Sequence, residues 1–438
     1  MKRTRILFSF FIFITLCNFV SFCFASALDD KTSELENSLT SEACLIMESS
    51  TGKVIYEKNG YQTKYPASTT KILTAILAIE HCNLDENVTA SEFAINSIPS
   101  GYSTANIQIG ETLSVKDLLY VLMLQSANES AVILAEHISG SHDAFAELMN
   151  EKAKEIGCMN TNFVNSNGVH NENHYSTAYD LALIAKYCMQ NETFREIVKT
   201  TSYSLPATTA YPSDTRIFTN TNNLVIYDGR NRPDNYYYEY ATGIKTGYTS
   251  NAKNCLVSSA TKNGMDYICV VLGASINYGS SGSISARYVD TISLFNYGFD
   301  NFSFRKLKPE NSNIKTIEIE NATKDTKNLD LLVASDVTVL TSIDNRDSDI
   351  EPEIVLNDNV VAPISKGDII GKISYDVEGL RYTADLIAAS DVIESKSNKL
   401  LLNLFLILLL IGVIVFGTRF YNFRKRKLNM RYLKIKRG

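Results

Sequence analysis

Ser68 and Lys71 have the residue types and the spacing of a nucleophile and its base. They stand at the start of an apolar segment that follows Pro66. Residues three positions apart lie on one face of a helix, so the Lys71 amine can reach the Ser68 hydroxyl and take its proton, provided that the amine is neutral. The beginning of a helix also offers free amides and a positive dipole end to an oxyanion. The pair predicts a serine nucleophile.

This spacing is weak evidence alone, because the chain contains five other serines followed three positions later by lysine. What distinguishes Ser68 is that Pro66-Ala67 leads directly into an apolar helical pattern. The other pairs are Ser50/Lys53, Ser250/Lys253, Ser259/Lys262, Ser303/Lys306 and Ser312/Lys315.

Ser126 and Asn128 lie in a predicted break within the apolar helical region 115–139. A second hydroxyl and an amide held in a loop can relay a proton and orient a substrate carbonyl. Helix capping by Ser and Asn explains the same residues without any catalytic role. Taken alone, this set favours the capping interpretation.

Lys245, Thr246 and Gly247 form the third set, on a predicted strand. A cation and a hydroxyl, followed by a glycine that lets a ligand approach the backbone, suit a substrate carboxylate. The alternative is an exposed edge strand that a lysine protects from aggregation.

Together and in this order, the three sets resemble the signature of the penicillin-recognising serine acyl enzymes. The sequence is most similar to the low-molecular-weight penicillin-binding proteins of the D-alanyl-D-alanine carboxypeptidase family, over roughly residues 40–300. In the middle set the family more often has glycine where Ala127 stands, which affects the expected pocket shape. The resemblance rests on Tyr65-Pro-Ala-Ser-Thr-Thr-Lys71, Ser126-Ala-Asn128, Asn165-Ser-Asn-Gly168 with Ser176-Thr177, Thr242-Gly-Ile-Lys-Thr-Gly247, and Arg287 ahead of Phe295-Asn-Tyr-Gly-Phe299.

The resemblance implies three catalytic residues. Ser68 attacks the carbonyl between two terminal D-alanines, Lys71 takes its proton, and Ser126 passes a proton to the departing D-alanine. Water then resolves the acyl-enzyme. The implied substrates are peptidoglycan peptide stems, with β-lactam antibiotics as acylating inhibitors, and no metal or other cofactor is implied.

The resemblance also implies a set of substrate-binding residues. Asn128 holds the peptide, and Lys245 supplies positive potential. Thr246 and Arg287 bind the terminal carboxylate, while the backbone amides of Ser68 and Tyr248 form the oxyanion hole. The full set is Asn128, Lys245, Thr246, Gly247, Tyr248 and Arg287.

The histidines and cysteines of the sequence do not predict a metal site. His170 and His174 have the spacing of zinc ligands on a helix, but Gly168 and the neighbouring asparagines predict a loop with solvated histidines. The cysteines beyond the first 27 residues show neither disulfide nor metal spacing, and apolar runs such as that around Cys269 predict buried free thiols.

Both ends of the chain are basic, although the formal net charge is −6. The acidic body between them argues against nucleic-acid binding.

Residues 1–27 read as a signal peptide, with cleavage after Ala27. The apolar run 400–417 covers about 27 Å as a helix, close to the thickness of a bilayer core. Because basic residues follow it, we expect one span at 399–418, a cytoplasmic tail at 419–438 and a catalytic domain outside the cell membrane.

The order of predicted elements indicates an α/β fold: a β-lactamase/transpeptidase-like α/β sandwich with an all-helical insert, a small all-β domain and a C-terminal transmembrane helix. We expect the serine DD-peptidase domain at 28–303 and the small β-rich domain at 304–396. Predicted strands are 43–47, 53–56, 255–260 and 267–273, and predicted helices are 71–82, 115–139 with its break, 142–156, 178–189 and 285–297.

Three alternatives accompany the carboxypeptidase hypothesis. A β-lactamase shares the motifs, but it needs neither the β domain nor the span, and no deacylating glutamate can be assigned. A DD-endopeptidase or transpeptidase of the same family differs only in the bond or nucleophile that it accepts. A non-catalytic penicillin-binding sensor has no need to keep Ser68, Lys71, Ser126 and Lys245 together.

Overall fold

The computed structural model describes residues 28–213, 215–229, 235–279, 282–346, 350–395 and 397–435. The predicted signal peptide lies outside them. The chain divides into two compact units, Met1–Ser303 with Ser342–Asp344, and Phe304–Thr341 with Asn345–Gly438. Each unit is described by itself.

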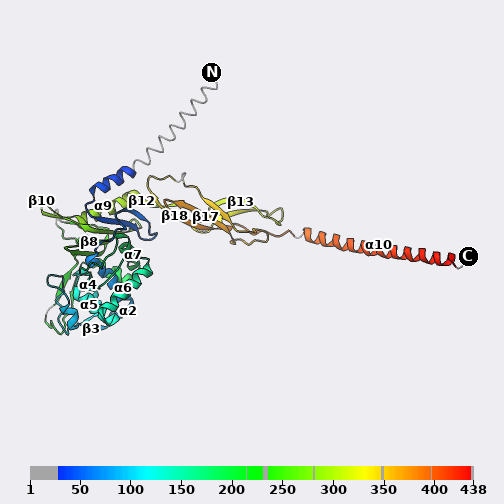
Figure 1. Cartoon of the computed structure of the whole chain (residues 1–438). Helices are drawn as coiled ribbons and strands as arrows, with labels where there is room; N and C mark the ends of the chain where they lie inside the picture. Colours follow the sequence, from blue (N-terminus) through cyan, green and yellow to red (C-terminus); the bar gives the residue numbers. More distant parts are fainter. Residues whose placement is uncertain are drawn as a thin grey trace, which may run out of the picture. The chain divides into compact units, whose positions relative to one another are not determined.

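The first unit is built on an antiparallel sheet with strand order β2-β1-β9-β8-β7. Its strands come from both ends of the unit, as the sequence predicts. In β9, Ile268 and Val270 face the helical core, whereas Tyr267 contacts Phe299 of α9. Helices therefore cover both faces of the sheet (Figure 1). The strands are β1 (Ala43–Glu48), β2 (Val54–Lys58), β7 (Ala241–Thr249), β8 (Lys253–Lys262) and β9 (Met265–Ala274).

Helices and small hairpins fill the chain between β2 and β7, and α9 closes the unit. The helical elements are η1 (Ala67–Thr70), α2 (Lys71–His81), α3 (Glu92–Asn96), α4 (Val115–Leu124), α5 (Asn128–Ser139), α6 (His142–Ile156), α7 (Ala178–Cys188), α8 (Glu192–Lys199) and α9 (Ala286–Asn301). The hairpins pair β3 (Asn87–Thr89) with β4 (Thr112–Ser114), β5 (Ser202–Leu205) with β6 (Arg216–Thr219), and β10 (Ile276–Gly279) with β11 (Gly282–Ser285).

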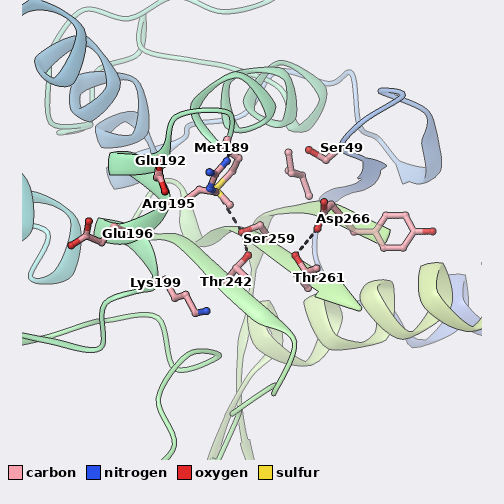
Figure 2. A pocket seen from close by; sticks show the side chains of 13 residues that line it. Ser49, Met189, Glu192, Arg195, Glu196, Lys199, Thr242, Ser259, Thr261 and Asp266 are labelled. Atoms are coloured by element: carbon pink, nitrogen blue, oxygen red, sulfur yellow. Dashed lines mark hydrogen bonds between the residues drawn. The ribbon is translucent and has the colours of Figure 1, made fainter. Parts of the chain in front are cut away.

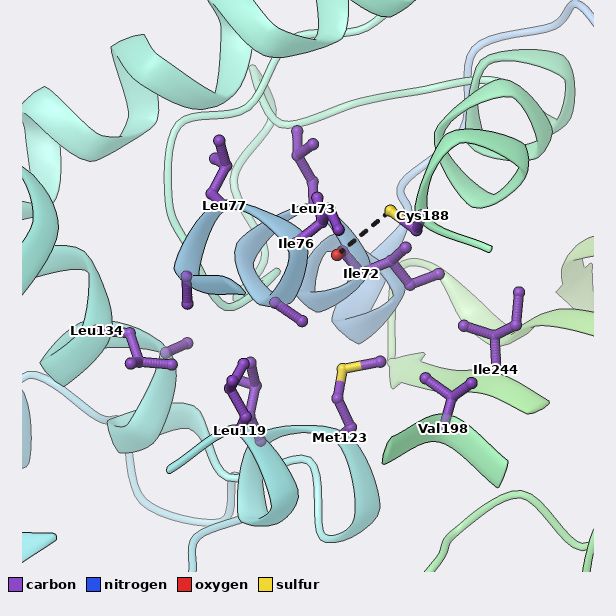
Figure 3. Packing of buried hydrophobic residues seen from close by; sticks show 14 of the residues in the cluster. Ile72, Leu73, Ile76, Leu77, Leu119, Met123, Leu134, Cys188, Val198 and Ile244 are labelled. Carbon is purple, nitrogen blue, oxygen red and sulfur yellow. Dashed lines mark hydrogen bonds between the residues drawn. The ribbon is translucent and has the colours of Figure 1, made fainter. Parts of the chain in front are cut away.

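Helix α2 is the centre of the helical core. Every residue from Lys71 to Ala78 is buried, as expected of a helix that is apolar on all sides. Figure 3 shows its leucines and isoleucines among side chains of α4, α5, α7 and α8. Because this core surrounds α2, the residues at the beginning of the helix have a fixed backbone.

The second unit is an antiparallel β domain with strand order β13-β14-β18-β17-β16 and a β12-β15 pair. Alternate residues of β14, namely Leu329, Leu331 and Val333, are buried, which is the pattern of a strand with one solvated face. The strands are β12 (Phe302–Lys308), β13 (Asn313–Glu318), β14 (Asn328–Val333), β15 (Val337–Ser342), β16 (Glu353–Leu356), β17 (Ile369–Val377) and β18 (Leu380–Ala388).

The last helix, α10 (Ser397–Ile435), contains the predicted span. Its segment Leu401–Asn429 is long and apolar enough to cross a membrane, and none of its apolar window is buried by the rest of the protein. An apolar helix without protein cover is compatible with a membrane anchor.

Candidate active site

Ser68 lies in η1, the tight turn from which α2 continues. The preceding residue, Ala67, has φ +49°, a left-handed conformation that few residues other than glycine adopt. Two glycines approach this turn closely. A Cβ on Gly168 would lie 1.9 Å from the Ala67 carbonyl oxygen, and one on Gly247 would lie 3.1 Å from the Ser68 nitrogen. Glycine is therefore required at Gly168 for the turn to have this position.

The Lys71 amine contacts three oxygens. Its Nζ lies 2.8 Å from Asn128 Oδ1, 2.6 Å from the Asn167 carbonyl oxygen and 3.0 Å from Ser68 Oγ. A neutral amine has two N–H donors and one lone pair. The two carbonyl oxygens can only accept, so they take both donors, and the lone pair is left for the Ser68 hydroxyl.

The surroundings of Lys71 favour this neutral form. Complete burial is the largest cause that moves its pKa well below the usual range for lysine, and the charge of Lys245 acts in the same direction. The carboxylate of Glu129 opposes them. The resulting amine is suited to accept a proton from Ser68 near neutral pH.

Ser126 and Asn128 bring the second motif to the same place. Ser126 is nearly buried and has φ +64°, a strained conformation of the kind found at functional sites. Asn128 begins α5, and its Nδ2 donates to the Ser103 carbonyl oxygen at 2.8 Å. That bond orients Oδ1 toward Lys71, so Asn128 contacts the Lys71 amine directly.

The third motif lies on β7, which is one of the two edge strands of the sheet among the described residues. Lys245 is 1% exposed, and its Nζ donates to the Thr246 carbonyl oxygen at 3.1 Å. The Thr246 hydroxyl lies 2.7 Å from that of Thr221, and Arg287 Nη1 donates to the Gly247 carbonyl oxygen at 3.4 Å. Hydroxyls and cations thus converge beside the Ser68 turn.

One cleft of about 350 Å³ collects most of these groups. Tyr248 stands exposed at its edge, whereas Lys71 and Lys245 lie beneath its surface. The structure therefore brings all the predicted site residues into one region. The cleft is lined by Ser68, Gly101, Tyr102, Ser103, Ser126, Asn128, Thr221, Thr246, Gly247, Tyr248, Thr249, Ser250 and Arg287.

A second cavity, of about 450 Å³, is larger but contains none of the predicted catalytic or substrate-binding residues. It lies beside α8 and the strands β7 and β8. Its hydroxyls already have partners, because those of Thr242 and Ser259 pair with each other and that of Thr261 donates to the Asp266 carboxylate (Figure 2). The smaller cleft is therefore the candidate active site, because it contains the predicted site residues although it is not the larger of the two cavities.

The prediction of a solvated loop is wrong for His174. This residue is 2% exposed, and its Nε2 lies 2.8 Å from the Thr70 hydroxyl, directly beneath the Ser68 turn. Burial is the main cause that lowers its pKa to about 3, so the ring is neutral. The Val164 amide donates to its Nδ1, which leaves the proton on Nε2. His174 therefore supports the turn that carries Ser68.

Several groups at the site could not be assigned a contact from residue type and spacing. The Asn167 carbonyl oxygen, the Ser103 carbonyl oxygen and the Thr221 hydroxyl all contact motif residues. Two of them are backbone groups, which residue identity does not reveal.

Comparison with known proteins agrees with this geometry. A family model described as D-alanyl-D-alanine carboxypeptidase matches residues 30–276, more than half of the chain. The chain belongs to this family. A second model, described as the C-terminal domain of penicillin-binding protein 5, matches residues 302–394. The predictions of the family, of the fold class and of a serine-type D-Ala-D-Ala carboxypeptidase are confirmed.

Individual proteins of known name are similar to this chain in sequence and structure. The D-alanyl-D-alanine carboxypeptidase DacF of Bacillus subtilis is 32% identical over 393 residues, which cover 88% of this chain and 94% of the relative. The D-alanyl-D-alanine endopeptidase of Escherichia coli is 31% identical over 250 residues, covering 56% of this chain and 76% of the relative. Penicillin-binding protein 5 of Haemophilus influenzae has a similar structure, with a TM-score of 0.60 and 27% identity, covering 81% of this chain and 98% of that one.

Gly168 provides a test of how this carboxypeptidase positions Ser68. Gly168→Ala places a Cβ against the Ala67 carbonyl, so the turn must move. Because a misplacement of about 1 Å can cost about 10²-fold in rate, we expect penicillin to acylate the variant about 10²-fold more slowly. Gly110→Ala is the matched control, since Gly110 has φ +77° against +79° for Gly168 but meets no atom within 4 Å. Equal acylation rates in the two variants would contradict the expectation.

Lys245 predicts a pH dependence of stability. Burial and the nearby charge of Arg287 lower its pKa to about 7 in the folded carboxypeptidase, against about 10.4 in an unfolded chain. Between these two pKa values the folded state binds fewer protons than the unfolded state, so the free energy of unfolding rises with pH. From pH 6 to pH 9 we expect it to rise in the wild type by about 2 to 3 kcal/mol more than in Lys245→Met. Denaturant titrations measure this, and parallel pH profiles would show that Lys245 keeps an ordinary pKa.

Proposed function

We propose that this carboxypeptidase removes the terminal D-alanine from peptidoglycan peptide stems through an acyl-enzyme on Ser68. The observation that carries the proposal is the Lys71 amine, which has two carbonyl acceptors and faces the Ser68 hydroxyl at 3.0 Å. No step requires a cofactor. We propose the same serine as the target of β-lactam antibiotics.

In the acylation step, Ser68 Oγ attacks the carbonyl carbon of the penultimate D-alanine while Lys71 Nζ takes the hydroxyl proton. The amides of Ser68 and Tyr248 are proposed to bind the oxyanion. Ser126 then relays the proton held by Lys71 to the departing amine, the C–N bond breaks, and free D-alanine leaves. Water attacks the ester, which releases the shortened peptide and restores the Ser68 hydroxyl.

Selection of a C-terminal residue is assigned to the β7 side of the cleft. Lys245 and Arg287 give positive potential there, and the Thr246 hydroxyl is available to a carboxylate. A free carboxylate binds favourably where cations and hydroxyl donors converge. Asn128 is proposed to hold the peptide backbone on the opposite side.

The proposed location follows from α10 and the charges around it. We propose that residues 28–303 form the catalytic domain and 304–396 a β-rich spacer outside the cell membrane. Residues 399–418 would span the bilayer, and the basic tail 419–438 would be cytoplasmic, because Lys and Arg favour that side. This arrangement places the cleft on the side where peptidoglycan lies.

A second activity is suggested by the similarity to a D-alanyl-D-alanine endopeptidase. The two activities differ in whether the leaving amine belongs to free D-alanine or to a cross-linked stem. The test incubates the full chain in detergent with a muramyl pentapeptide ending in D-Ala-D-Ala and, separately, with a cross-linked stem dimer. A higher kcat/KM for D-alanine release from the pentapeptide than for cleavage of the dimer supports the carboxypeptidase activity. A higher kcat/KM for cleavage of the dimer would mean that the protein acts mainly as an endopeptidase.

A further inference from the structure

Cys82, Glu86 and His137 gather in the helical part of the first unit, outside the catalytic cleft. One ligand atom from each lies within 4.8 Å of the others. The three come from separate elements: Cys82 is the C-cap residue of α2, Glu86 precedes β3, and His137 is in the last turn of α5. Cys82 is partly exposed, whereas the other cysteines in the described chain are buried. A thiol in this position is accessible to an ion from solution.

The geometry of the group suits a tetrahedral ion. His137 Nε2 and Glu86 Oε1 are 3.3 Å apart. Zinc binds imidazole nitrogen and carboxylate oxygen at about 2.0–2.1 Å, so two tetrahedral ligands of this kind lie about 3.3 Å apart. The Asn83 amide donates to Glu86 Oε1 at 3.1 Å and fixes the orientation of the carboxylate, as hydrogen bonds behind metal ligands commonly do.

We propose that Cys82, Glu86 and His137 bind one Zn²⁺ ion, with water as the fourth ligand. A thiolate, an imidazole and a carboxylate form a donor set that zinc accepts, and the thiolate disfavours Mg²⁺ and Ca²⁺. Binding replaces the thiol proton of Cys82 and the direct contact between Glu86 and His137.

The position of the site gives the ion a structural consequence. Helix α2 begins with Lys71 and ends at the site, and α5 begins with Asn128 and carries His137 in its last turn. The two helices are about 16 to 18 Å long, so the ion lies one helix length from the reacting atoms. The ion would join the C-terminal ends of α2 and α5. At their N-terminal ends, the first residues of the two helices, Lys71 and Asn128, already contact each other. The metal would thus stabilise these helices and take no part in the chemistry.

The test uses the full chain in detergent micelles, stripped of metal by a chelator and kept reduced by a phosphine. Co²⁺ is the probe, because a thiolate ligand gives a near-ultraviolet charge-transfer band and a tetrahedral site gives intense visible bands. We expect one Co²⁺ per chain, displaced by one Zn²⁺, and a Zn²⁺-dependent rise in Tm. Cys82→Ser should abolish the charge-transfer band, and Glu86→Gln and His137→Gln should each weaken binding at least tenfold.

Two matched controls identify the ligands. His81→Gln removes the histidine next to Cys82, and Cys158→Ser removes a buried thiol, so both variants should bind Co²⁺ like the wild type. Acylation by penicillin in every variant would show that the chain is folded. The proposal is overturned if the wild type shows no stoichiometric charge-transfer band, or if that band survives in Cys82→Ser.

Discussion

Replacing Ser68 by alanine is expected to reduce D-alanine release from the pentapeptide by at least about 10⁴-fold. The covalent route needs the Ser68 oxygen, and without it only binding and the oxyanion amides remain to assist a direct attack by water. Lys245, Thr246 and Arg287 are unchanged in this variant, so its noncovalent affinity for the peptide should change by only a few fold. Release is measured by a coupled D-amino acid assay, and affinity by calorimetry.

Ser103→Ala is the matched control for this substitution. Ser103 lines the same cleft, and its contribution to Asn128 comes from its backbone carbonyl. We therefore expect less than about a tenfold loss of activity, since no side-chain role is assigned to it. If Ser68→Ala kept more than a hundredth of the wild-type rate, the nucleophile would have to be another group.

Lys71→Met is expected to slow acylation by about 10⁴-fold, whether the acylating agent is the pentapeptide or penicillin. Methionine fills similar volume without a lone pair that can accept the Ser68 proton. The cost of burying an ionisable amine is also removed, so we expect no loss of thermal stability comparable with the loss of rate. Stopped-flow acylation by a fluorescent penicillin gives the rate, and calorimetry gives the Tm.

Two further lysine variants separate the role of base from the role of charge. Lys71→Arg keeps a positive group that does not deprotonate near neutral pH, so it should be as slow as Lys71→Met if the amine is the base. Lys64→Met removes a lysine that pairs with Glu42 on the surface, and it should acylate within about threefold of the wild type. Rapid acylation in Lys71→Arg would mean that Lys71 acts through its charge.

Much of the fold was predictable from local patterns. The apolar helical pattern at 71–82 and the run before Gly157 predicted α2 and α6 closely, because hydrophobic period and a glycine C-cap are local signals. The break at Ser126 was visible for the same reason, since it separates two apolar helices. The site residues were found because three motifs occur in a fixed order, although each motif is weak alone.

Other features depend on tertiary contacts that the sequence does not display. His174 looks like a loop histidine, and only the fold places it under Thr70. The Asn167 carbonyl takes part through its backbone, which any residue possesses. The short helix α8 was missed, because eight residues carry little periodic signal. Cys82, Glu86 and His137 are too widely spaced for any metal motif and meet only through α2 and α5.

The proposal on which the mechanism depends is that Ser68 carries the acyl group during turnover. Its most direct test mixes the full chain with the pentapeptide, quenches the reaction with acid at millisecond to second intervals, and maps the digested protein by mass spectrometry. We expect a peptide containing Ser68 that is heavier by the acyl group of the stem peptide without its last D-alanine. This peptide should form no later than free D-alanine and should be absent in Ser68→Ala. An acyl group on another residue, or D-alanine release from enzyme whose Ser68 is unmodified at every time point, would contradict it.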